Sequence, residues 1–154
     1  MNNANGAEKL VELLKGKNVD TIFCITGAGN LAIVDALVRE ATFKILYSHH
    51  EQAAVMEAQG YSRVSGKPGV VIVTTGGGTS NTLTGVLSAF LDSVPVLIIS
   101  GNESSYHCES DKKLRAFGVQ GFDSVQVLQP VTKFSLRIES TDDLEKDFDS
   151  AWQI

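Results

Sequence analysis

The sequence predicts an α/β fold, a three-layer doubly wound domain with a largely parallel central sheet flanked by helices. Short apolar runs alternate along the chain with longer segments whose apolar residues recur at helical spacing. Several short runs are apolar throughout, as in Val70-Val71-Ile72-Val73, which is typical of strands buried on both faces of a parallel sheet. The 154 residues have the length of one ordinary domain, and 43% of them are hydrophobic, so the chain can bury a core.

The first half of the chain predicts a helix followed by two strand-and-helix pairs. Leu10, Val11, Leu13 and Leu14 mark one face of an amphipathic helix, whereas residues 21–25 are almost entirely apolar and rich in β-branched and aromatic side chains. In order, the predicted elements are a helix over residues 7–18, a strand over 21–25, a helix over 31–38, a strand over 43–47 and a helix over 51–65.

The next part of the chain begins with a turn at Lys67-Pro68-Gly69, because Pro and Gly are the usual turn residues. Thr79 or Ser80 is expected to cap the helix that follows the next strand. The predicted elements here are a strand over residues 70–74, a helix over 83–91 and a strand over 96–99.

The C-terminal part of the sequence is less regular. Residues 101–121 are polar and are the best candidate for a loop at the active edge of the sheet. Alternating character predicts an outer strand over 131–138. A last helix is expected over 142–152, with Thr141 or Asp142 as its cap.

Charge argues against two classes of partner. The net charge is −5, and the 13 basic residues are scattered along the chain rather than clustered. Nucleic acids and anionic membranes bind clustered Lys and Arg, so neither is an expected partner.

The N-terminus and the cysteines favour a cytoplasmic protein. The start of the chain lacks a basic segment followed by an apolar run, and no apolar run reaches the roughly 18 residues of a membrane span. Cys24 and Cys108 lie far apart without close-spaced partners, so neither a disulfide framework nor a zinc knuckle is expected. Both thiols are interpreted as structural.

Two successive strands each lead into a helix through a segment whose residues could bind a ligand or take part in catalysis. Glu51 follows the strand over 43–47, and the strand over 70–74 ends in the segment Thr74-Thr75-Gly76-Gly77-Gly78. In an open parallel sheet both segments lie at the same edge, where such folds bind ligands. The glycines can cradle an anion with backbone N–H groups or allow a flat ring to approach closely, and the segment lacks the Lys of a phosphate-binding loop.

A dinucleotide-binding module is the alternative function. Gly27-Ala28-Gly29-Asn30-Leu31-Ala32 follows a strand and opens a helix, so its spacing fits the G-x-G-x-x-A fingerprint of NAD-binding domains. That fingerprint also requires an acidic residue about 20 positions further on, and Glu51 lies somewhat beyond this distance. A purely structural turn explains the glycines equally well.

A metal site is not expected in this chain. His49 and His50 precede Glu51, and only His107 and Cys108 offer further ligands. Tetrahedral sites need three or four converging ligands, so structural roles for the two adjacent histidines are favoured.

Several linked motifs resemble the N-terminal pyrimidine-binding domain of thiamine-diphosphate enzymes, and those of the acetolactate synthase group above all. The resemblance extends over nearly the whole chain in order and spacing. The motifs that carry it are His50-Glu51-Gln52-Ala53-Ala54, Glu57-Ala58-Gln59-Gly60-Tyr61-Ser62-Arg63, Ser65-Gly66-Lys67-Pro68-Gly69-Val70, Thr74-Thr75-Gly76-Gly77-Gly78-Thr79-Ser80-Asn81 and Phe90-Leu91-Asp92-Ser93-Val94-Pro95-Val96.

The resemblance implies thiamine diphosphate as the cofactor and Glu51 as the residue that activates it. In the family, this glutamate hydrogen-bonds a ring nitrogen of the aminopyrimidine, which favours the imino tautomer that removes the proton from the thiazolium carbon. It also implies that Gln120 faces a 2-keto acid substrate. The cofactor-binding residues that it implies are Gly27, Ala28, Gly29, Glu51, Thr74, Thr75, Gly77, Gly78 and Asn81.

Three departures from the family pattern leave the substrate open. The first turn, Thr26-Gly27-Ala28-Gly29, lacks the usual proline, and Gly77 stands where the second turn has one. The loop before Gln120 is longer, and Gly121 replaces a common acidic residue. A relative that decarboxylates another keto acid, or that acts on a keto-sugar, is therefore as compatible as acetolactate synthesis.

The resemblance also implies partners. In the family, Mg²⁺ and the diphosphate are held by a Gly-Asp-Gly segment of a separate domain, and this sequence contains no such segment. Residues 1–154 are therefore expected to form the pyrimidine-binding domain of a longer chain or of a split enzyme. The missing domain lies on the same or a partner chain, and a homodimer or tetramer is expected because family members complete the site across a subunit interface.

Overall fold

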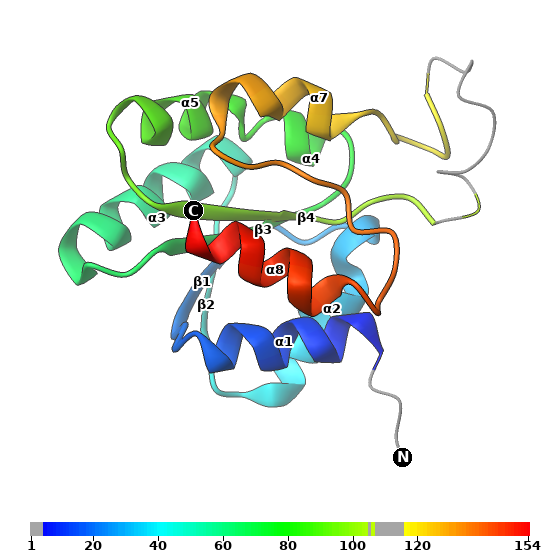
Figure 1. The fold of residues 1–154 in the computed structure, drawn as a ribbon, viewed down its shortest axis with the longest axis horizontal. Coiled ribbons are helices and arrows are strands. Elements are labelled where there is room, and N and C mark those ends of the chain that lie inside the picture. The colour runs from blue at the N-terminus through cyan, green and yellow to red at the C-terminus, as the bar shows by residue number, and fades with distance from the viewer. Residues whose placement is uncertain (1–4, 105, 107–115) are drawn as a thin grey trace.

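A four-stranded, fully parallel sheet organises the molecule. The computed structural model describes residues 5–104, 106 and 116–154. The strands lie in the order β2-β1-β3-β4, so β1 and β3 are central and β2 and β4 are at the edges (Figure 1). Phe23 in β1 pairs with Leu46 in β2 and with Val71 in β3. The strands are β1 (Thr21–Cys24), β2 (Lys44–Tyr47), β3 (Gly69–Val73) and β4 (Val96–Ser100).

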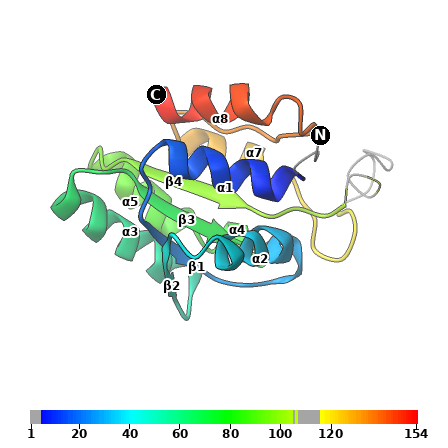
Figure 2. The same cartoon turned by 90° about the horizontal axis from the view of Figure 1, so that it is seen from below.

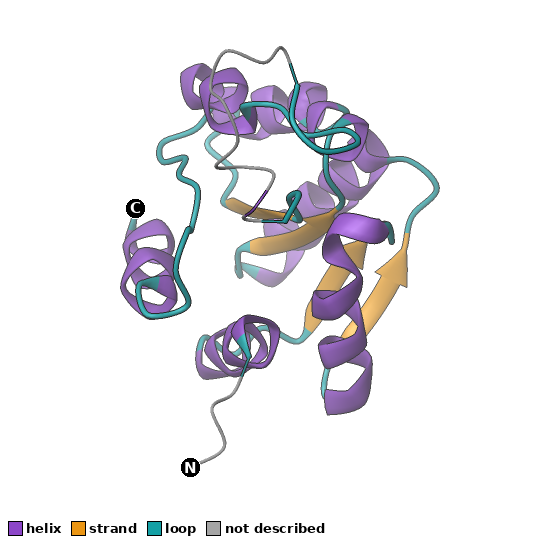
Figure 3. Cartoon of the chain, turned by 90° about the vertical axis from the view of Figure 1, so that its right-hand side faces the viewer, coloured by secondary structure: helices purple, strands orange, loops and turns teal. Residues whose placement is uncertain are grey.

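Helices cover both faces of this sheet, which gives three layers. Figure 2 shows α1 and α8 on one side of the strands and α3 and α5 on the other, and in Figure 3 the strands lie between two groups of helices. The helices are α1 (Gly6–Gly16), α2 (Leu31–Glu40), α3 (Glu51–Ser65), α4 (Gly77–Ser80), α5 (Leu83–Leu91), α7 (Ser124–Leu128) and α8 (Leu144–Gln153), with short 3₁₀ turns at Ala28–Asn30 and Gln129–Val131. The α/β class predicted from the sequence is confirmed.

Alternate residues of the central strands build two separate cores. Ile22 and Ile72 point to one face, where they pack with α1, α2 and α8. Phe23 and Val71 point to the other face, where they pack with α3 and α5. All five residues of β3 are buried, as the apolar run predicted. The two cores fix the sheet between the helices and so fix the position of its carboxyl edge.

The predicted outer strand over 131–138 is wrong. Residues 129–131 form a 3₁₀ turn, and residues 134–140 have no regular secondary structure. Exposure along 131–138 comes in pairs of residues rather than alternating, so the segment does not have one buried face. This segment instead lines a groove of about 1050 Å³ beside β4, together with α8 and α5. Within the described residues β4 therefore pairs only with β3.

The predicted helix caps are also wrong. Thr79 and Ser80 lie inside α4, a one-turn helix that the sequence did not predict, and α5 begins after Thr82. The last helix begins at Leu144 after Asp143, whose side chain makes no capping hydrogen bond. The helix α7 falls in a stretch for which no helix was predicted. Among the helices of the described residues, none is both long and apolar enough to cross a membrane.

Candidate functional site

The carboxyl edge of the sheet contains a topological switch point. From β1 the chain passes to β2 on one side, then crosses over to β3 on the other side of β1. The crevice between the ends of β1 and β3 is where open parallel sheets bind ligands. The turn after β1 holds Gly27, Ala28 and Gly29, and the turn after β3 begins at Thr74.

The turns after β1, β3 and β4 touch one another directly. The N–H of Gly29 donates to Oγ1 of Thr74 at 3.1 Å. A Cβ on Gly27 would lie 2.5 Å from the Cβ of Thr74, and a Cβ on Gly101 would lie 2.2 Å from the carbonyl oxygen of Gly29. Because such distances are too short for any side chain, the three turns can meet at this spacing only with glycine at these positions.

The turn after β1 is braced internally, which does not favour the dinucleotide alternative. Asn30 is fully buried, and its side chain accepts the N–H of Gly27 at 2.8 Å and donates to the carbonyl of Ile25 at 2.8 Å. With the N–H of Gly29 bound to Thr74, two backbone donors of the Gly-Ala-Gly turn are already occupied. A pyrophosphate at a dinucleotide site needs such donors to be available. Ala28, between them, is exposed.

Glu51 begins α3, as the sequence predicted, and is almost fully buried, with 9% of its surface exposed. His50 caps the helix by accepting the N–H of Gln52 on its Nδ1 at 3.2 Å. Asn81 donates through Nδ2 to Oε2 of Glu51 at 3.0 Å. In the part of the chain that the structure describes, Oε1 of Glu51 has no hydrogen-bond partner. One carboxylate oxygen is therefore held in place, and the other is available to a ligand.

The short helix α4 holds Asn81 and leaves space beside Glu51. A Cβ on Gly78 would lie 2.7 Å from Cγ2 of Thr74 and 3.4 Å from Oε1 of Glu51, so glycine allows the close packing on Thr74 and adds no atom beside the carboxylate. Gly77 is exposed and has no atom within 4 Å of such a Cβ. Thr79 ties the helix to the sheet because its Oγ1 donates to the carbonyl of Thr74 at 2.9 Å and contacts the hydroxyl of Ser100.

Thr75 carries a buried hydroxyl without a partner. Its side chain is 7% exposed, and among the buried side-chain atoms of the described residues only its Oγ1 lacks a hydrogen bond. A Cβ on Gly29 would lie 2.1 Å from this oxygen, so the hydroxyl lies at the contact between the turns after β1 and β3. Buried polar groups are rarely left unpaired, so this hydroxyl is an unusual feature of the contact between the two turns.

Gln120 lies against the start of α4. A Cβ on Gly76 would be 2.6 Å from both the Cβ and the carbonyl oxygen of Gln120. Gly76 has a φ of +67°, a conformation that glycine adopts without strain. Gln120 is exposed, and it reaches the site through a contact between residues far apart in the sequence. The sequence indicated Gly76 only as a member of the glycine segment after β3, and it did not single out Gly101, although both follow a strand at this edge.

The histidines and cysteines form no metal site in the described part of the chain. No group of three or more His, Cys, Asp or Glu residues that could hold a metal ion occurs within residues 5–104, 106 and 116–154. His49 and His50 are exposed, and the expected further ligands His107 and Cys108 lie outside the described residues. Cys24 is a free, fully buried thiol, and burial raises its pKa to about 11.

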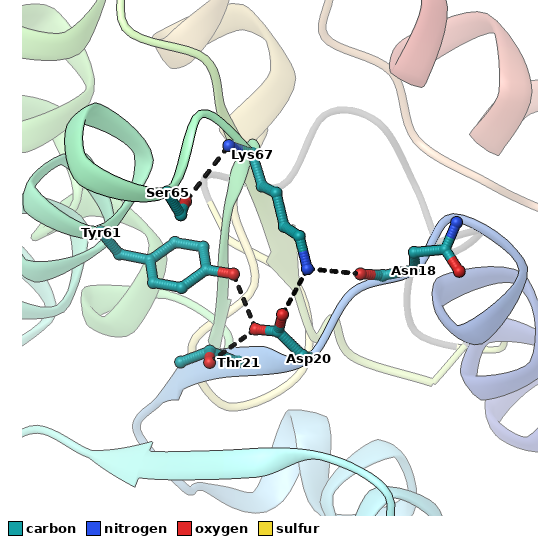
Figure 4. A network of polar contacts seen from close by, with 6 residues as sticks. All are labelled: Asn18, Asp20, Thr21, Tyr61, Ser65 and Lys67. Atoms are coloured by element: carbon teal, nitrogen blue, oxygen red, sulfur yellow. Dashed lines mark hydrogen bonds and ion pairs between the residues drawn. The ribbon is translucent and has the colours of Figure 1, made fainter.

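A second polar cluster lies at the opposite edge, where β1 and β3 begin (Figure 4). Asp20 accepts hydrogen bonds from Lys67, from the hydroxyl of Tyr61 at 2.6 Å and from that of Thr21 at 2.8 Å. These hydrogen bonds lower the pKa of Asp20 to about 2, and the one from Lys67 has the largest effect. Lys67 also donates to the carbonyl of Asn18 at 3.4 Å. Because it lies at the other end of the strands, this cluster does not belong to the site.

The arrangement at the carboxyl edge suits a flat, polar ring. It combines an oriented carboxylate, an unpaired buried hydroxyl and a glycine segment that allows a planar group to approach. No basic side chain takes part in these contacts, so nothing in them compensates the charge of a phosphate.

Comparison with known proteins agrees with this description. Residues 4–134 match the family described as "Thiamine pyrophosphate enzyme, N-terminal TPP binding domain". The acetolactate synthase large subunit of Haemophilus influenzae is 38% identical over 154 residues, which are 100% of this chain and 26% of that protein. That of Lactococcus lactis is 36% identical over 92% of this chain and 24% of its own length. The chloroplastic acetolactate synthase of Arabidopsis thaliana is 33% identical over 96% of this chain and 21% of its own length. The chain thus spans about a quarter of the length of these relatives.

Proposed function

The chain belongs to the thiamine pyrophosphate enzyme family, as an N-terminal TPP binding domain, and we propose that Glu51 activates the pyrimidine half of the cofactor. The observation that carries this proposal is the state of the Glu51 carboxylate. Asn81 fixes Oε2 at 3.0 Å, and Gly78 adds no atom beside Oε1. A buried carboxyl held in this way can share a proton with a ring nitrogen at a defined position.

Other residues of the crevice hold and orient the ring. Gly77 and Gly78 allow it to lie close to the backbone, and Asn81 keeps the Glu51 carboxylate facing it. The hydroxyl of Thr75 gains the hydrogen bond that it lacks. The crevice is bounded on the β1 side by Thr74 and by the turn Gly27-Ala28-Gly29. When bound, thiamine diphosphate supplies a nucleophilic thiazolium carbon and an electron sink for the decarboxylation of a 2-keto acid.

The reaction and the partners belong to this proposal as well. The relatives are named acetolactate synthases, which favours a lyase or transferase that acts on a 2-keto acid and passes the acyl group to an acceptor. In this proposal Gln120 faces the keto acid. Mg²⁺ and the diphosphate are held by another domain, on the same or a partner chain, in a cytoplasmic homodimer or tetramer. Residues 1–154 then supply the pyrimidine half of the site.

The test replaces Glu51 by Gln in the complete enzyme. Glu51→Gln keeps the size and an oxygen for Asn81 but cannot give up or share a proton. Exchange of the thiazolium proton of the bound cofactor with D₂O, followed by NMR after acid quenching, is expected to slow by at least about 100-fold, the usual contribution of an acid–base group. Glu57→Gln is the matched control, because Glu57 is an exposed residue of the same helix whose carboxylate binds Ser48 at 2.5 Å. Unchanged exchange in Glu51→Gln with the cofactor bound would refute the proposal.

A further inference from the structure

Glu103 lies on the segment that leaves β4 and is half-buried beneath a turn at residues 117–121. The turn is closed by two backbone hydrogen bonds: the N–H of Phe117 donates to the carbonyl of Gly121 at 3.2 Å, and the N–H of Gly121 donates to that of Phe117 at 2.8 Å. The two segments are separated by more than ten residues in the sequence. Their contact is therefore a tertiary one.

The turn is built around the Glu103 carboxylate. Oε1 accepts the N–H of Val119 at 3.2 Å and the N–H of Gln120 at 3.0 Å. Gly118 has a φ of +61°, and a Cβ there would lie 2.4 Å from Oε2 of Glu103. Glycine thus allows both the turn conformation and the close approach of the carboxylate. Hydrogen bonds to a charged acceptor are stronger than those between neutral groups, so this side chain adds a strong constraint to the turn.

This turn places Gln120 at the site. The Cβ and carbonyl oxygen of Gln120 pack on Gly76, which is the residue immediately before α4. Asn81, the residue immediately after α4, holds the Glu51 carboxylate. One of the two N–H groups that Glu103 accepts belongs to Gln120 itself, so a change in the Glu103 contact acts on Gln120 directly.

We propose that Glu103 is a positioning residue that holds Gln120 at the substrate end of the cofactor site. The proposal rests on the function proposed above, in which Gln120 faces the keto acid. It assigns to Glu103 no contact with substrate or cofactor. Glu103 acts on the orientation of Gln120, whereas cofactor activation by Glu51 proceeds without it.

The first test measures the turn itself and needs no activity. Hydrogen exchange of the peptide that covers residues 117–121 is followed by mass spectrometry in the complete protein without cofactor. Glu103→Ala removes the acceptor and is expected to speed exchange of the Val119 and Gln120 amides by at least tenfold. Glu103→Gln retains an oxygen that can accept both, so exchange close to that of the unchanged protein is expected. Glu12→Ala, on the exposed face of α1, controls for the loss of a carboxylate. Equal exchange in Glu103→Ala and the unchanged protein would overturn the proposal.

The second test separates positioning from activation. In Glu103→Ala, kcat/KM for the keto acid is expected to fall about tenfold while exchange of the thiazolium proton is unchanged, and Glu103→Gln is expected to restore most of the loss. Gln120→Ala should lower kcat/KM by itself, and adding Glu103→Ala to it should cause no further loss. Independent, multiplying losses in the double variant would contradict a role through Gln120. A failure of the proposed function is recognised separately, because it appears as unchanged proton exchange in Glu51→Gln.

Discussion

Glycine occurs within two helices that pack on each other, and only one of the two positions requires it. In α5, a Cβ on Gly85 would lie 2.6 Å from the Cβ of Val55, so glycine allows α5 to pack closely on α3. In α3, Gly60 is exposed and has no atom within 4 Å of such a Cβ. Gly85 is therefore required by packing within the chain, whereas nothing in the described residues requires Gly60.

These two positions give a matched pair of substitutions. Gly85→Ala is expected to lower the free energy of unfolding by about 1–3 kcal/mol, because a branched side chain on a neighbouring helix cannot move aside cheaply. Gly60→Ala is expected to raise it by about 0.5–1 kcal/mol, because alanine loses less backbone entropy in a helix. Urea unfolding followed by circular dichroism measures both. Similar destabilisation by the two substitutions would show that the contact with Val55 is not the cause.

At the same scale, the sequence was informative about residues whose chemistry depends on their neighbours along the chain. Glu51 was expected at the start of a helix, and α3 begins there. Gly101 and Glu103 could not be identified in this way, because their roles depend on Gly29 and Gln120, which are distant in the sequence. Thr75 was identified through its motif, but its unpaired hydroxyl is a property of the folded crevice alone.

At the scale of elements, the cluster around Asp20 joins three of them. Asp20 directly precedes β1, Tyr61 comes from α3, and Lys67 comes from the turn between α3 and β3 (Figure 4). The pKa of Tyr61 is raised by burial and by its hydrogen bond to Asp20, and that of Lys67 is raised by its hydrogen bond to Asp20. The cluster thus fixes the amino ends of the central strands.

This cluster predicts an acid-dependent part of the stability. The pKa of Asp20 is lowered from 3.8 to about 2, so its contribution is present above pH 4 and is lost as the pH falls towards 2. Because the ion pair is about half exposed, with side-chain exposures of 46% and 53%, the contribution is expected to be about 1 kcal/mol or less. Asp20→Asn should lower the free energy of unfolding more at pH 7 than at pH 2, as measured by urea titration at both values. Asp149→Asn, which removes a partly exposed ion pair with Lys17, controls for the lost charge. An equal effect of Asp20→Asn at both pH values would exclude ionisation of Asp20 as the cause.

The strands were predicted better than the C-terminal elements. The four strands β1 to β4 were each predicted within one or two residues. In β1 and β3 the apolar runs reflect burial between two layers of helices, whereas β2 is largely exposed and β4 is half-buried. The segment over 131–138 alternates in sequence, yet a strand also needs a neighbouring strand to pair with, and in the described part of the chain β4 pairs only with β3. Periodicity reports which side chains are apolar, and it carries no information about pairing.

At the scale of the whole molecule, the two cores protect the central strands from solvent. Cys24 ends β1 and is fully buried in the core formed with α1, α2 and α8. Burial raises the pKa of its thiol to about 11, so the reactive thiolate is scarce at neutral pH even before access is considered. Reaction of this thiol therefore requires opening of the sheet.

Alkylation of Cys24 is thus expected to report global unfolding. Iodoacetamide labelling at pH 8, resolved by peptide mass spectrometry, should be slower than that of a short cysteine peptide by about the equilibrium constant for unfolding. Its rate should rise with urea in parallel with the unfolding transition measured by circular dichroism. Labelling that is faster than global unfolding allows would reveal local opening at the end of β1 instead.

The direct contacts between the strand-end turns also limit how this scaffold can diversify. Gly29 and Gly101 meet backbone to backbone, and Gly27 meets Thr74 without room for any added atom. The spacing of these turns is therefore a fixed dimension that mutation cannot adjust in small steps. Variation in ligand preference has to arise from parts that can accept new side chains, such as exposed Gly77 and the turn that bears Gln120. A directed-evolution library aimed at a changed ligand preference is best confined to those positions, with the glycine contacts left unchanged.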